Sequence, residues 1–356
     1  DIEILMENNM SIYKIKRCSK EEKPLLIEFI NKYWKEDHVF VKSDELFDFQ
    51  HYNRISDDYN FLIGWNTISN EIDGIVGLIP VSHYDVMLYP NNESWGGIWK
   101  IREDVHNDEI GVLGLLLFEW FYKTNLHISI GLSPIAIKLN KVMKYKTGYM
   151  NQFFILNEKR KKFDIAKIPL EYKYIVPENH NKLYCIKKVQ SEEVLFAHNN
   201  ITVKYHPVKS INYLYNRYLK HPIYKYKLWG VYRENELELI FVTRSIFIRN
   251  SSVIRIVDAL GNFDSINSSL YEDFQKMLQD SDAEYIDLVN YGIDEAIIEA
   301  WGFDKLDTSS NELVIPEYFE PFVRENHLLN YAYKSKEDIK VVIFKGDADQ
   351  DRPNII

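Results

Sequence analysis

Two glycines separated by two residues stand directly before an apolar segment in the first half of the chain. Gly111 and Gly114 lie in the run 110–114, and a predicted helix follows at 115–123. A glycine loop that enters a helix presents backbone N–H groups and the positive end of the helix dipole to an anion. The spacing therefore predicts an anion site, most often one for phosphate. The alternative is that both glycines only let a helix begin close to a sheet.

A second group of residues that could do chemistry lies near the C-terminus. Acidic residues alternate at Asp347, Asp349 and Asp351, and Arg352 follows. Their carboxylates could bind hydroxyl groups or an amine, and the guanidinium could pair with phosphate. An EF-hand calcium loop would need a glycine at its sixth position and a glutamate at its twelfth, so we predict no metal site. The segment is either a solvated acidic tail or a part of the chain that folds into an interdomain cleft.

The elements that must position these residues alternate between strands and helices. Apolar residues at helix spacing predict two early helices, and alternating or continuous apolar runs predict strands. The predicted strands of the first half are 11–16, 60–65, 73–80, 97–102, 128–132 and 152–156. The predicted helices are 20–36, 43–51, 115–123 and a helix that begins at Ser133-Pro134.

The second half repeats this order. The predicted strands are 226–232, 237–244, 252–260 and 285–288, and the predicted helices are 269–278 and 294–301. About 45 residues separate Lys100 from Tyr145, and about 48 separate Arg255 from Phe303, which indicates a degenerate internal duplication. No second glycine follows Gly261 before the helix. We therefore expect the anion site in the first half only.

Composition restricts the class of protein. A net charge of −10 argues against nucleic acid as the main partner, although an anionic small molecule needs only local positive charge. The two cysteines, Cys18 and Cys185, have no metal-like spacing and fit thiols of a reducing compartment. The longest apolar run, 110–122, contains Glu119 and is too short to cross a bilayer. With no signal peptide visible, we expect a cytoplasmic protein without membrane insertion.

The order strand, loop, helix, strand, helix, strand over 94–157 resembles the acyl-CoA-binding core of the GCN5-related N-acetyltransferases. The resemblance implies an α/β fold of two tandem domains, each a mixed twisted sheet flanked by helices. The implied divisions are an acyl-CoA-binding domain at 10–160, a connector at 161–190, a degenerate second domain at 191–330 and a C-terminal segment at 331–356, placed at the interdomain cleft.

Four blocks carry a closer resemblance to sugar N-acyltransferases of the FdhC type. They are 215–226, 255–258, 315–322 and 344–354. That type transfers an acyl group, acetyl or 3-hydroxybutanoyl, from acyl-CoA to the 3-amino group of a dTDP-linked 3-amino-3,6-dideoxyhexose. The pathways are those of surface polysaccharides such as lipopolysaccharide O-antigen or capsule. A non-catalytic sugar-nucleotide-binding protein and a Fem-like aminoacyltransferase are the alternatives, and the acidic charge counts against the second.

The resemblance also assigns residues to acyl-CoA. The fourth strand of the family fold binds the pantetheine arm, and the glycine loop binds the pyrophosphate. The implied co-substrate residues are Lys100, Ile101, Arg102, Ile110, Gly111, Val112, Leu113, Gly114 and Asn140. Asn140 stands where the family usually has a tyrosine acid, and water could protonate a thiolate whose ordinary pKa is near 8.5.

Amide formation from a thioester also needs a path for one proton. His38, Asp85 and Glu103 are the candidate bases, each with a structural or solvated role as the alternative. A sugar amine that loses its proton to water needs no enzymic base. The residues that could bind the nucleotide sugar are Arg217, His221, Tyr224, Asp347, Asp349, Asp351 and Arg352.

Overall fold

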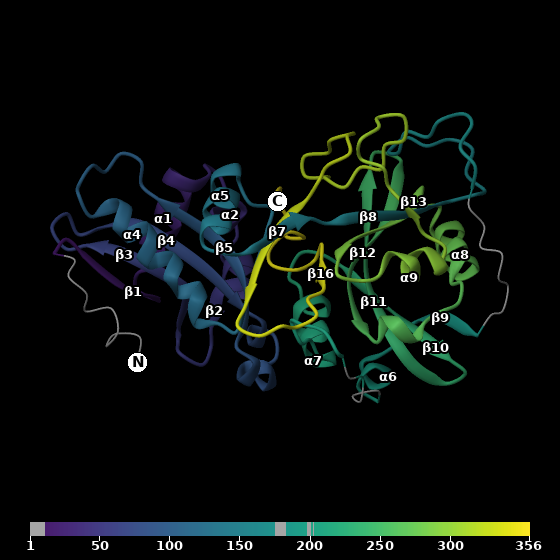
Figure 1. Cartoon of the computed structure of the whole chain (residues 1–356), viewed down its shortest axis with the longest axis horizontal. Coiled ribbons are helices and arrows are strands. Elements are labelled where there is room, and N and C mark those ends of the chain that lie inside the picture. The colour runs from purple at the N-terminus through teal and green to yellow at the C-terminus, as the bar shows by residue number, and fades with distance from the viewer. Residues whose placement is uncertain (1–10, 175–182, 198–200, 202) are drawn as a thin grey trace. The chain divides into compact units, whose positions relative to one another are not determined.

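The computed structural model describes residues 11–174, 183–197, 201 and 203–356. Within these residues the strands form two mixed sheets of eight strands each, and helices flank both (Figure 1). This confirms the predicted α/β fold with two similar halves. None of the described helices combines the length and the apolar character that a membrane crossing requires.

The first sheet has the strand order β1-β3-β4-β5-β6-β15-β7, and β2 pairs with β3. Its strands are β1 (Tyr13–Ser19), β2 (Tyr52–Asn53), β3 (Asp58–Asn66), β4 (Glu71–Pro80), β5 (Glu93–Ile101), β6 (Leu126–Ile130), β7 (Lys146–Tyr149) and β15 (Asn330–Ser335). The strands β1, β3, β4 and β5 are antiparallel neighbours, whereas β6 runs parallel to β5. A parallel partner requires a crossover, and the helix after β5 supplies it.

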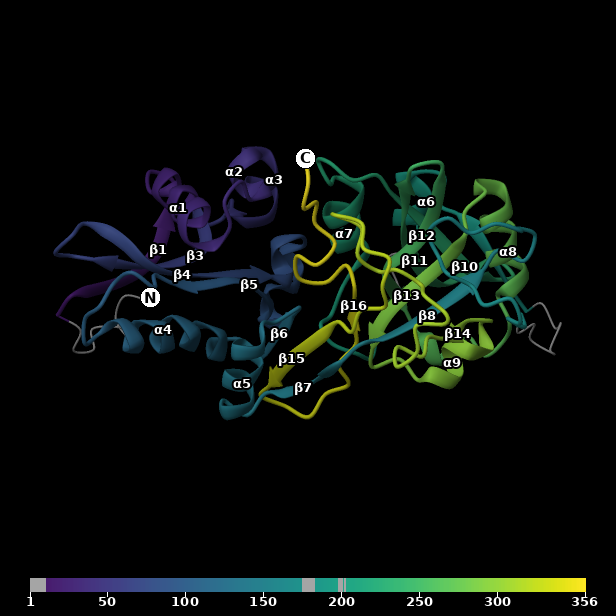
Figure 2. The ribbon, with the colours of Figure 1, turned by 90° about the horizontal axis from the view of Figure 1, so that it is seen from above.

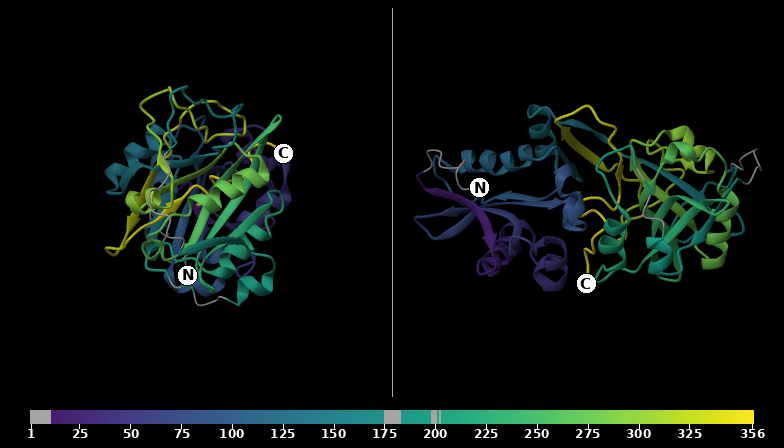
Figure 3. Two further views of the ribbon diagram at one scale, coloured as in Figure 1. Left: turned by 90° about the vertical axis from the view of Figure 1, so that its right-hand side faces the viewer. Right: turned by 90° about the horizontal axis from the view of Figure 1, so that it is seen from below.

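Helices cover both faces of this sheet. The helical segments before β6 are α1 (Lys23–Phe29), η2 (Ile30–Trp34), α2 (Val39–Lys42), α3 (Asp44–His51), η3 (Val81–His83), η4 (Val86–Asn91), α4 (Ile110–Phe118) and η5 (Glu119–Lys123). Figures 2 and 3 show α1 to α3 on one face and α4 on the other. Polar side chains start several of them; the Ser43 hydroxyl, for example, accepts the N–H of Leu46 at 3.1 Å.

The second sheet has the order β14-β8-β13-β12-β11-β10-β9, and β16 pairs with β13. Its strands are β8 (Asn151–Leu156), β9 (Tyr184–Lys188), β10 (Tyr226–Arg233), β11 (Glu236–Ile248), β12 (Ser251–Gly261), β13 (Tyr285–Tyr291), β14 (Asp304–Lys305) and β16 (Ile343–Phe344). The remaining helical segments are α5 (Pro134–Val142), α6 (Glu192–Phe196), α7 (Ile211–Leu214), η6 (Tyr215–Leu219), η7 (Phe263–Ser265), α8 (Tyr271–Ser281) and α9 (Glu295–Ala300).

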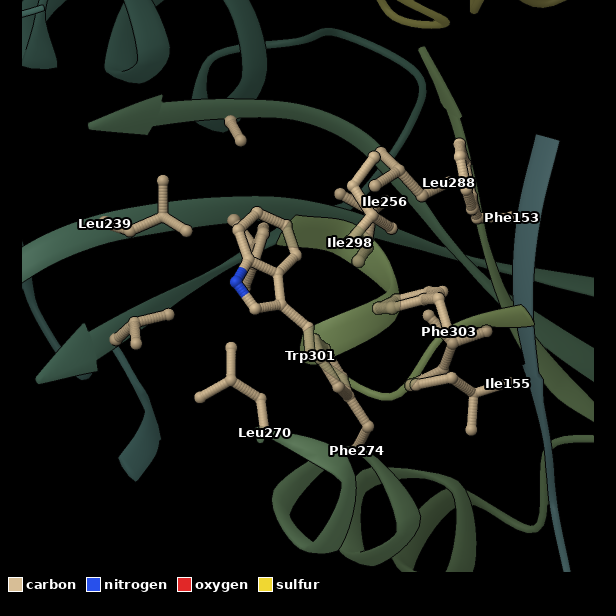
Figure 4. Packing of buried hydrophobic residues seen from close by; sticks show 14 of the residues in the cluster. Phe153, Ile155, Leu239, Ile256, Leu270, Phe274, Leu288, Ile298, Trp301 and Phe303 are labelled. Carbon is tan, nitrogen blue, oxygen red and sulfur yellow. The ribbon is translucent and has the colours of Figure 1, made fainter. Parts of the chain in front are cut away.

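Trp301 holds the core of the second half together. Its ring lies 5.6 Å from that of Phe241 on β11, and its indole N–H donates to the carbonyl of Ile266 at 2.9 Å. Figure 4 shows Phe274 of α8 and Ile298 of α9 beside it. One buried ring thus ties both helices to the sheet and leaves its polar atom satisfied.

The chain divides into two compact units. The first comprises the described residues up to Ser129, with Tyr333–Glu337 and Pro353–Ile356; the second comprises those of Ile130–Ala332 and Asp338–Arg352. These limits differ from the predicted division at residue 160. The strand expected to complete the first sheet, β8, pairs instead with β13 and β14. Residues 175–182 of the predicted connector lie outside the described residues.

Candidate functional site

A bulge interrupts β5 at the point where the strand leaves its parallel neighbour. Val76 of β4 pairs with Trp99, but Leu78 pairs with Gly96, so β5 carries one residue more than β4 between these pairs. A bulge leaves one residue out of the ladder and bends the strand. The pairing of β5 with β6 ends at Trp95, just before the bulge, although both strands continue. We call this place the β5/β6 fork.

Two glycines allow the backbone to take this course. A Cβ on Gly96 would lie 2.4 Å from Ser129 Oγ and 3.0 Å from His127 Nε2, both on β6. A Cβ on Gly97 would lie 3.3 Å from the carbonyl oxygen of Gly77 on β4. Gly97 keeps partial exposure, although its neighbours Gly96 and Ile98 are buried. The main chain of the bulge is therefore accessible on one side.

A chain of three polar side chains lies at the fork. Ser94 Oγ and His127 Nδ1 are 3.1 Å apart, and His127 Nε2 and Ser129 Oγ are also 3.1 Å apart. Ser94 and His127 are buried, whereas Ser129 is half-buried. The imidazole stacks on Phe121 at a centroid distance of 3.8 Å. Burial lowers the pKa of His127 to about 3, so the ring is neutral at physiological pH.

These three residues could not be recognised as a group from the sequence. Ser94 and His127 are 33 positions apart, and only the β5–β6 register brings them together. The available signal was weak: His127 and Ser129 are polar residues on the same face of an otherwise apolar strand. A buried parallel strand normally reads as a continuous apolar run.

The run 110–114 is helical and is not a loop. α4 begins at Ile110, five residues before the predicted start, and Gly114 is buried with its Cα toward β5. A Cβ there would lie 3.3 Å from Ile101 and 3.9 Å from Trp99. The alternative interpretation therefore holds for Gly114, which allows the helix to lie close to the sheet. Gly111, in contrast, occupies the first turn, and a Cβ there would meet nothing within 4 Å.

The charged residues at the end of β5 are bound to one another. Lys100 Nζ lies 2.5 Å from Glu103, and Arg102 lies within 3.1 Å of carboxylate oxygens of Glu71, Asp73 and Asp104. Hydrogen bonding from Arg102 lowers the pKa of Asp104 to about 2. These contacts give the predicted co-substrate residues Lys100 and Arg102, and the candidate base Glu103, ion-pair partners within the first unit.

The other two candidate bases cap helices. His38 Nδ1 accepts the N–H of Phe40 at the start of α2, and Asp85 Oδ1 accepts the N–H of Met87 at the start of η4. Both side chains are buried. The predicted co-substrate residue Asn140 lies on α5 in the second unit, where its amide donates to the carbonyl of Ala136 at 2.8 Å. Each of the three thus has a local structural role.

The second unit repeats the bulge and the fork. Val242 of β11 pairs with Asp258 and Thr243 pairs with Ile256, so β12 has its extra residue at Val257. The parallel pairs of β12 with β13 end at Ile256. This resembles the first unit in strand order and in having a bulge within a few residues of the last parallel pair. The duplication predicted from sequence is therefore present in the backbone.

The C-terminal segment occupies the second fork. Gly346 N–H donates to the carbonyl of Val257 at 2.6 Å, and Lys345 N–H donates to that of Val289 on β13 at 3.1 Å. A Cβ on Gly346 would lie 2.6 Å from Tyr218 Oη and 2.6 Å from the carbonyl oxygen of Val257, which explains the glycine. The chain's own backbone therefore lies where β12 and β13 separate.

A buried ion cluster secures this segment. Lys209 Nζ lies 2.7 Å from Asp258 and 2.6 Å from Asp347, and Tyr218 Oη donates to Asp258 at 2.7 Å. All three charged side chains are at most 1% exposed. Burial raises the pKa of Asp347 above its ordinary value although Lys209 opposes this. The predicted sugar ligand Asp347 is thus part of the interior.

Asp351 is also bound to an internal cation. Arg244 reaches both of its carboxylate oxygens, at 3.1 and 2.8 Å, and Tyr226 Oη donates to it at 2.7 Å. Burial alone would raise the pKa of Asp351, but Arg244 more than offsets this and the pKa lies below the ordinary value. The Arg244 guanidinium lies 3.9 Å from the centre of the Tyr224 ring.

The other predicted sugar ligands lie around this cluster. His221 Nδ1 accepts the N–H groups of Ile223 and Tyr224, and burial lowers its pKa to about 3. Arg217 is buried beside the Tyr218 ring. Asp349 and Arg352, 3.0 Å apart, are half-buried. The second unit therefore brings the predicted group together, and Tyr224, Asp349 and Arg352 are its half-buried members.

Comparisons with known proteins place this fold. No protein-family description and no curated protein matches the sequence. A GCN5-related N-acetyltransferase from Anabaena variabilis ATCC 29413 matches with a TM-score of 0.51 and 10% identity, covering 90% of this chain and 72% of that one. A probable N-acyltransferase from Enterococcus faecalis V583 matches with a TM-score of 0.52 and 12% identity, covering 91% and 72%. The chain has the fold of the GCN5-related N-acetyltransferases, in a two-domain arrangement.

Proposed function

We propose that this protein is an acyl-CoA-dependent N-acyltransferase whose acceptor is the amino group of a nucleotide-linked amino sugar. The observation that carries the proposal is the β5 bulge at the β5/β6 fork, in a fold shared with an N-acetyltransferase. Acyl transfer to an amine needs a polarised thioester carbonyl. A bulge supplies a backbone N–H outside the ladder for that purpose.

The first unit offers the remaining contacts for acyl-CoA. The first turn of α4 at Gly111 has open space above its backbone, and the positive end of the helix dipole favours a pyrophosphate there. In the second unit the corresponding fork contains Lys345 and Gly346. We therefore assign acyl-CoA to the first unit alone, in keeping with the expectation from sequence.

The reaction follows from this placement. The neutral amine attacks the thioester carbon while the N–H group of the bulge donates a hydrogen bond to the carbonyl oxygen and stabilises the negative charge that grows there. Collapse of the tetrahedral intermediate breaks the C–S bond and releases CoA. The attacking nitrogen loses one proton, and the leaving sulfur gains one.

The acceptor is the finer part of the proposal. The four FdhC-like blocks meet in the second unit: Gly346 contacts Val257, Tyr226 contacts Asp351, and Arg255 donates to the carbonyl of Glu317 at 2.7 Å. A dTDP-3-amino-3,6-dideoxyhexose is the acceptor that this resemblance favours, with an acetyl or 3-hydroxybutanoyl donor. Asp349 and Arg352 are half-buried and have the chemistry to bind sugar hydroxyls and phosphate.

The direct test is an activity matrix on the full chain, with dTDP- and UDP-linked amino sugars against acetyl-CoA and 3-hydroxybutanoyl-CoA. CoA release and amide formation are followed together. Turnover of a dTDP-3-amino sugar supports the whole proposal. CoA binding without turnover of any amino sugar would leave the fold but reject the acceptor class. Failure to bind CoA at all in calorimetry would reject acyl transfer itself.

One substitution tests the placement of acyl-CoA. Gly111→Asp puts a carboxylate beside the expected pyrophosphate, and we expect the KM for acyl-CoA to rise at least about tenfold, roughly 1.4 kcal/mol. An acid in the first turn of a helix stabilises that helix, so the fold should be retained. Gly111→Ala is the matched control, because its Cβ meets open space. An unchanged KM in Gly111→Asp would remove the pyrophosphate from this helix.

A further inference from the structure

His38, Asp85 and Glu103 each have a hydrogen-bond or ion-pair partner within three residues in the sequence. None of them is therefore assigned here to carry the proton that acyl transfer must move. The β5/β6 fork, however, contains a hydroxyl group that lies beside the bulge. Ser129 is the first residue of β6 after the last β5–β6 pair, Trp95 with Ile128, and its Oγ lies against Gly96, directly before the bulge. Ser129 is half-buried, whereas Ser94 and His127 are buried.

We propose that Ser129 is a catalytic residue that carries the proton of acyl transfer from the attacking nitrogen to the leaving sulfur, and that His127 and Ser94 are positioning residues that orient its hydroxyl. This rests on the proposed function. It adds a residue and a proton path that neither the fold nor the sequence resemblance supplies.

The hydrogen-bond chain defines the orientation. In the proposed arrangement the buried Ser94 hydroxyl donates to His127 Nδ1, 3.1 Å away, and the ring hydrogen is then on Nε2. Nε2–H then donates to one lone pair of Ser129 Oγ. The hydroxyl hydrogen of Ser129 is thereby directed away from the imidazole and toward the fork.

The environment of His127 supports a positioning role. Its ring is stacked on Phe121 and buried, and its low pKa keeps it neutral from pH 5 to 9. A ring that stays neutral does not take up the proton itself. It holds the hydroxyl in one orientation, as a fixed hydrogen-bond donor does when it pre-organises a reacting group.

The step balances in atoms and charge. The amine nitrogen forms a bond to the thioester carbon, and the C–S bond breaks. The nitrogen gives one proton to Ser129 Oγ while the Ser129 hydroxyl proton passes to sulfur. The products are an amide and the thiol of CoA, and Ser129 returns to its starting state without a net change.

The main test is Ser129→Ala in the full chain, with acetyl-CoA and the amino sugar that the activity matrix identifies. We expect kcat to fall at least about a hundredfold, the lower end for loss of a proton-transfer group. The Kd for CoA in calorimetry should stay within about twofold, because the hydroxyl binds no part of CoA in this scheme. Ser19→Ala, at the half-buried end of β1 in the same unit, is the matched control and should keep full activity.

A double-mutant cycle tests the positioning role. Ser94→Ala should lower kcat about tenfold, because His127 Nδ1 loses the partner that fixes the tautomer of the ring. The Kd for CoA should stay unchanged. In a Ser129→Ala background the same substitution should have no further effect, because both act through one hydroxyl. Independent, additive losses would show that Ser94 acts only on the structure of the strand and would overturn the chain as a unit.

The outcomes separate this inference from the proposed function. A wild-type protein that binds CoA and acylates an amino sugar confirms the function whatever Ser129 does. Ser129→Ala with kcat within about threefold of that protein would refute the proton path alone. A pH profile of kcat that shows a group with a pKa near 6.5 would also refute it if that group were absent from the profile of His127→Gln, because His127 would then be the base.

Discussion

Lys209 is the residue whose loss should most sharply damage the second unit. Its ammonium lies within 2.7 Å of both Asp258 and Asp347, and the three side chains are almost fully buried. Lys209→Met keeps the length and apolar stem but leaves two carboxylates together with no cation. Breaking a buried ion group by removing one partner costs about 3–5 kcal/mol. We expect the unfolding free energy of the second unit to fall by that amount at pH 8.

The loss should depend on pH in a defined direction. The native pKa of Asp347 is already raised by burial, and removal of Lys209 raises it further. Between the unfolded and the native pKa the native state binds more protons, so the unfolding free energy falls as pH rises. The difference between Lys209→Met and wild type should therefore shrink as pH falls from 8 to 5, because a protonated Asp347 no longer repels Asp258.

Urea unfolding of the full chain at pH 8 and pH 5, followed by tryptophan fluorescence, measures this. Lys276→Met is the matched control: Lys276 forms an ion pair with Asp280 at 2.7 Å, but both side chains are mostly exposed. Exposed pairs contribute about 0–1 kcal/mol. A Lys209→Met loss no larger than that of Lys276→Met, or a loss independent of pH, would refute the interpretation of the cluster as a buried ion group.

Two further predictions concern the candidate sites. The native pKa of His127 is about 3 and that of an unfolded histidine is near 6.5, so the unfolded chain binds one proton more between these pH values. The unfolding free energy should therefore fall by about 1.4 kcal/mol per pH unit from this residue as the pH decreases through that range. Urea midpoints at pH 6.5 and 4.5 should show a shallower decline in His127→Gln than in wild type. Asp349→Asn should lower kcat/KM for the proposed nucleotide sugar about tenfold, since the side chain is half-buried beside Arg352. Calorimetry should show an unchanged Kd for CoA. Equal kcat/KM values in Asp349→Asn and wild type would limit the segment to a structural role.

Much of the secondary structure could be predicted because local patterns determine it. The hairpin strands β3 and β4 and the strand β12 were expected within two residues of their observed bounds, since alternating and continuous apolar runs specify them. The start of α4 was not. Gly111 and Gly114 have low helix propensity, which favours a loop, but the missing side chain at Gly114 lets a helix lie close to Ile101 of the sheet.

Strand partners and buried charges could not be read in the same way. The pattern of β8 predicts a strand but not its neighbour, and pairing with β13 involves residues more than 100 positions away. The acids of the C-terminal segment look solvated in sequence. Lys209 and Arg244, which bind Asp347 and Asp351, are far from them in the chain, and only the fold shows that these carboxylates are internal.

The two forks give the same backbone geometry two different uses. In the second unit the bulge at Val257 is buried and bonded to Gly346, and β12 is buried along its whole length. In the first unit Gly97 and Ser129 retain partial exposure beside the bulge. In the second unit, the segment of chain that fills the fork satisfies backbone groups that a bulge would otherwise leave without partners. The acidic motif at the C-terminus therefore has a structural role, because it belongs to the segment that fills the second fork. Asp349 and Arg352 are its half-buried members.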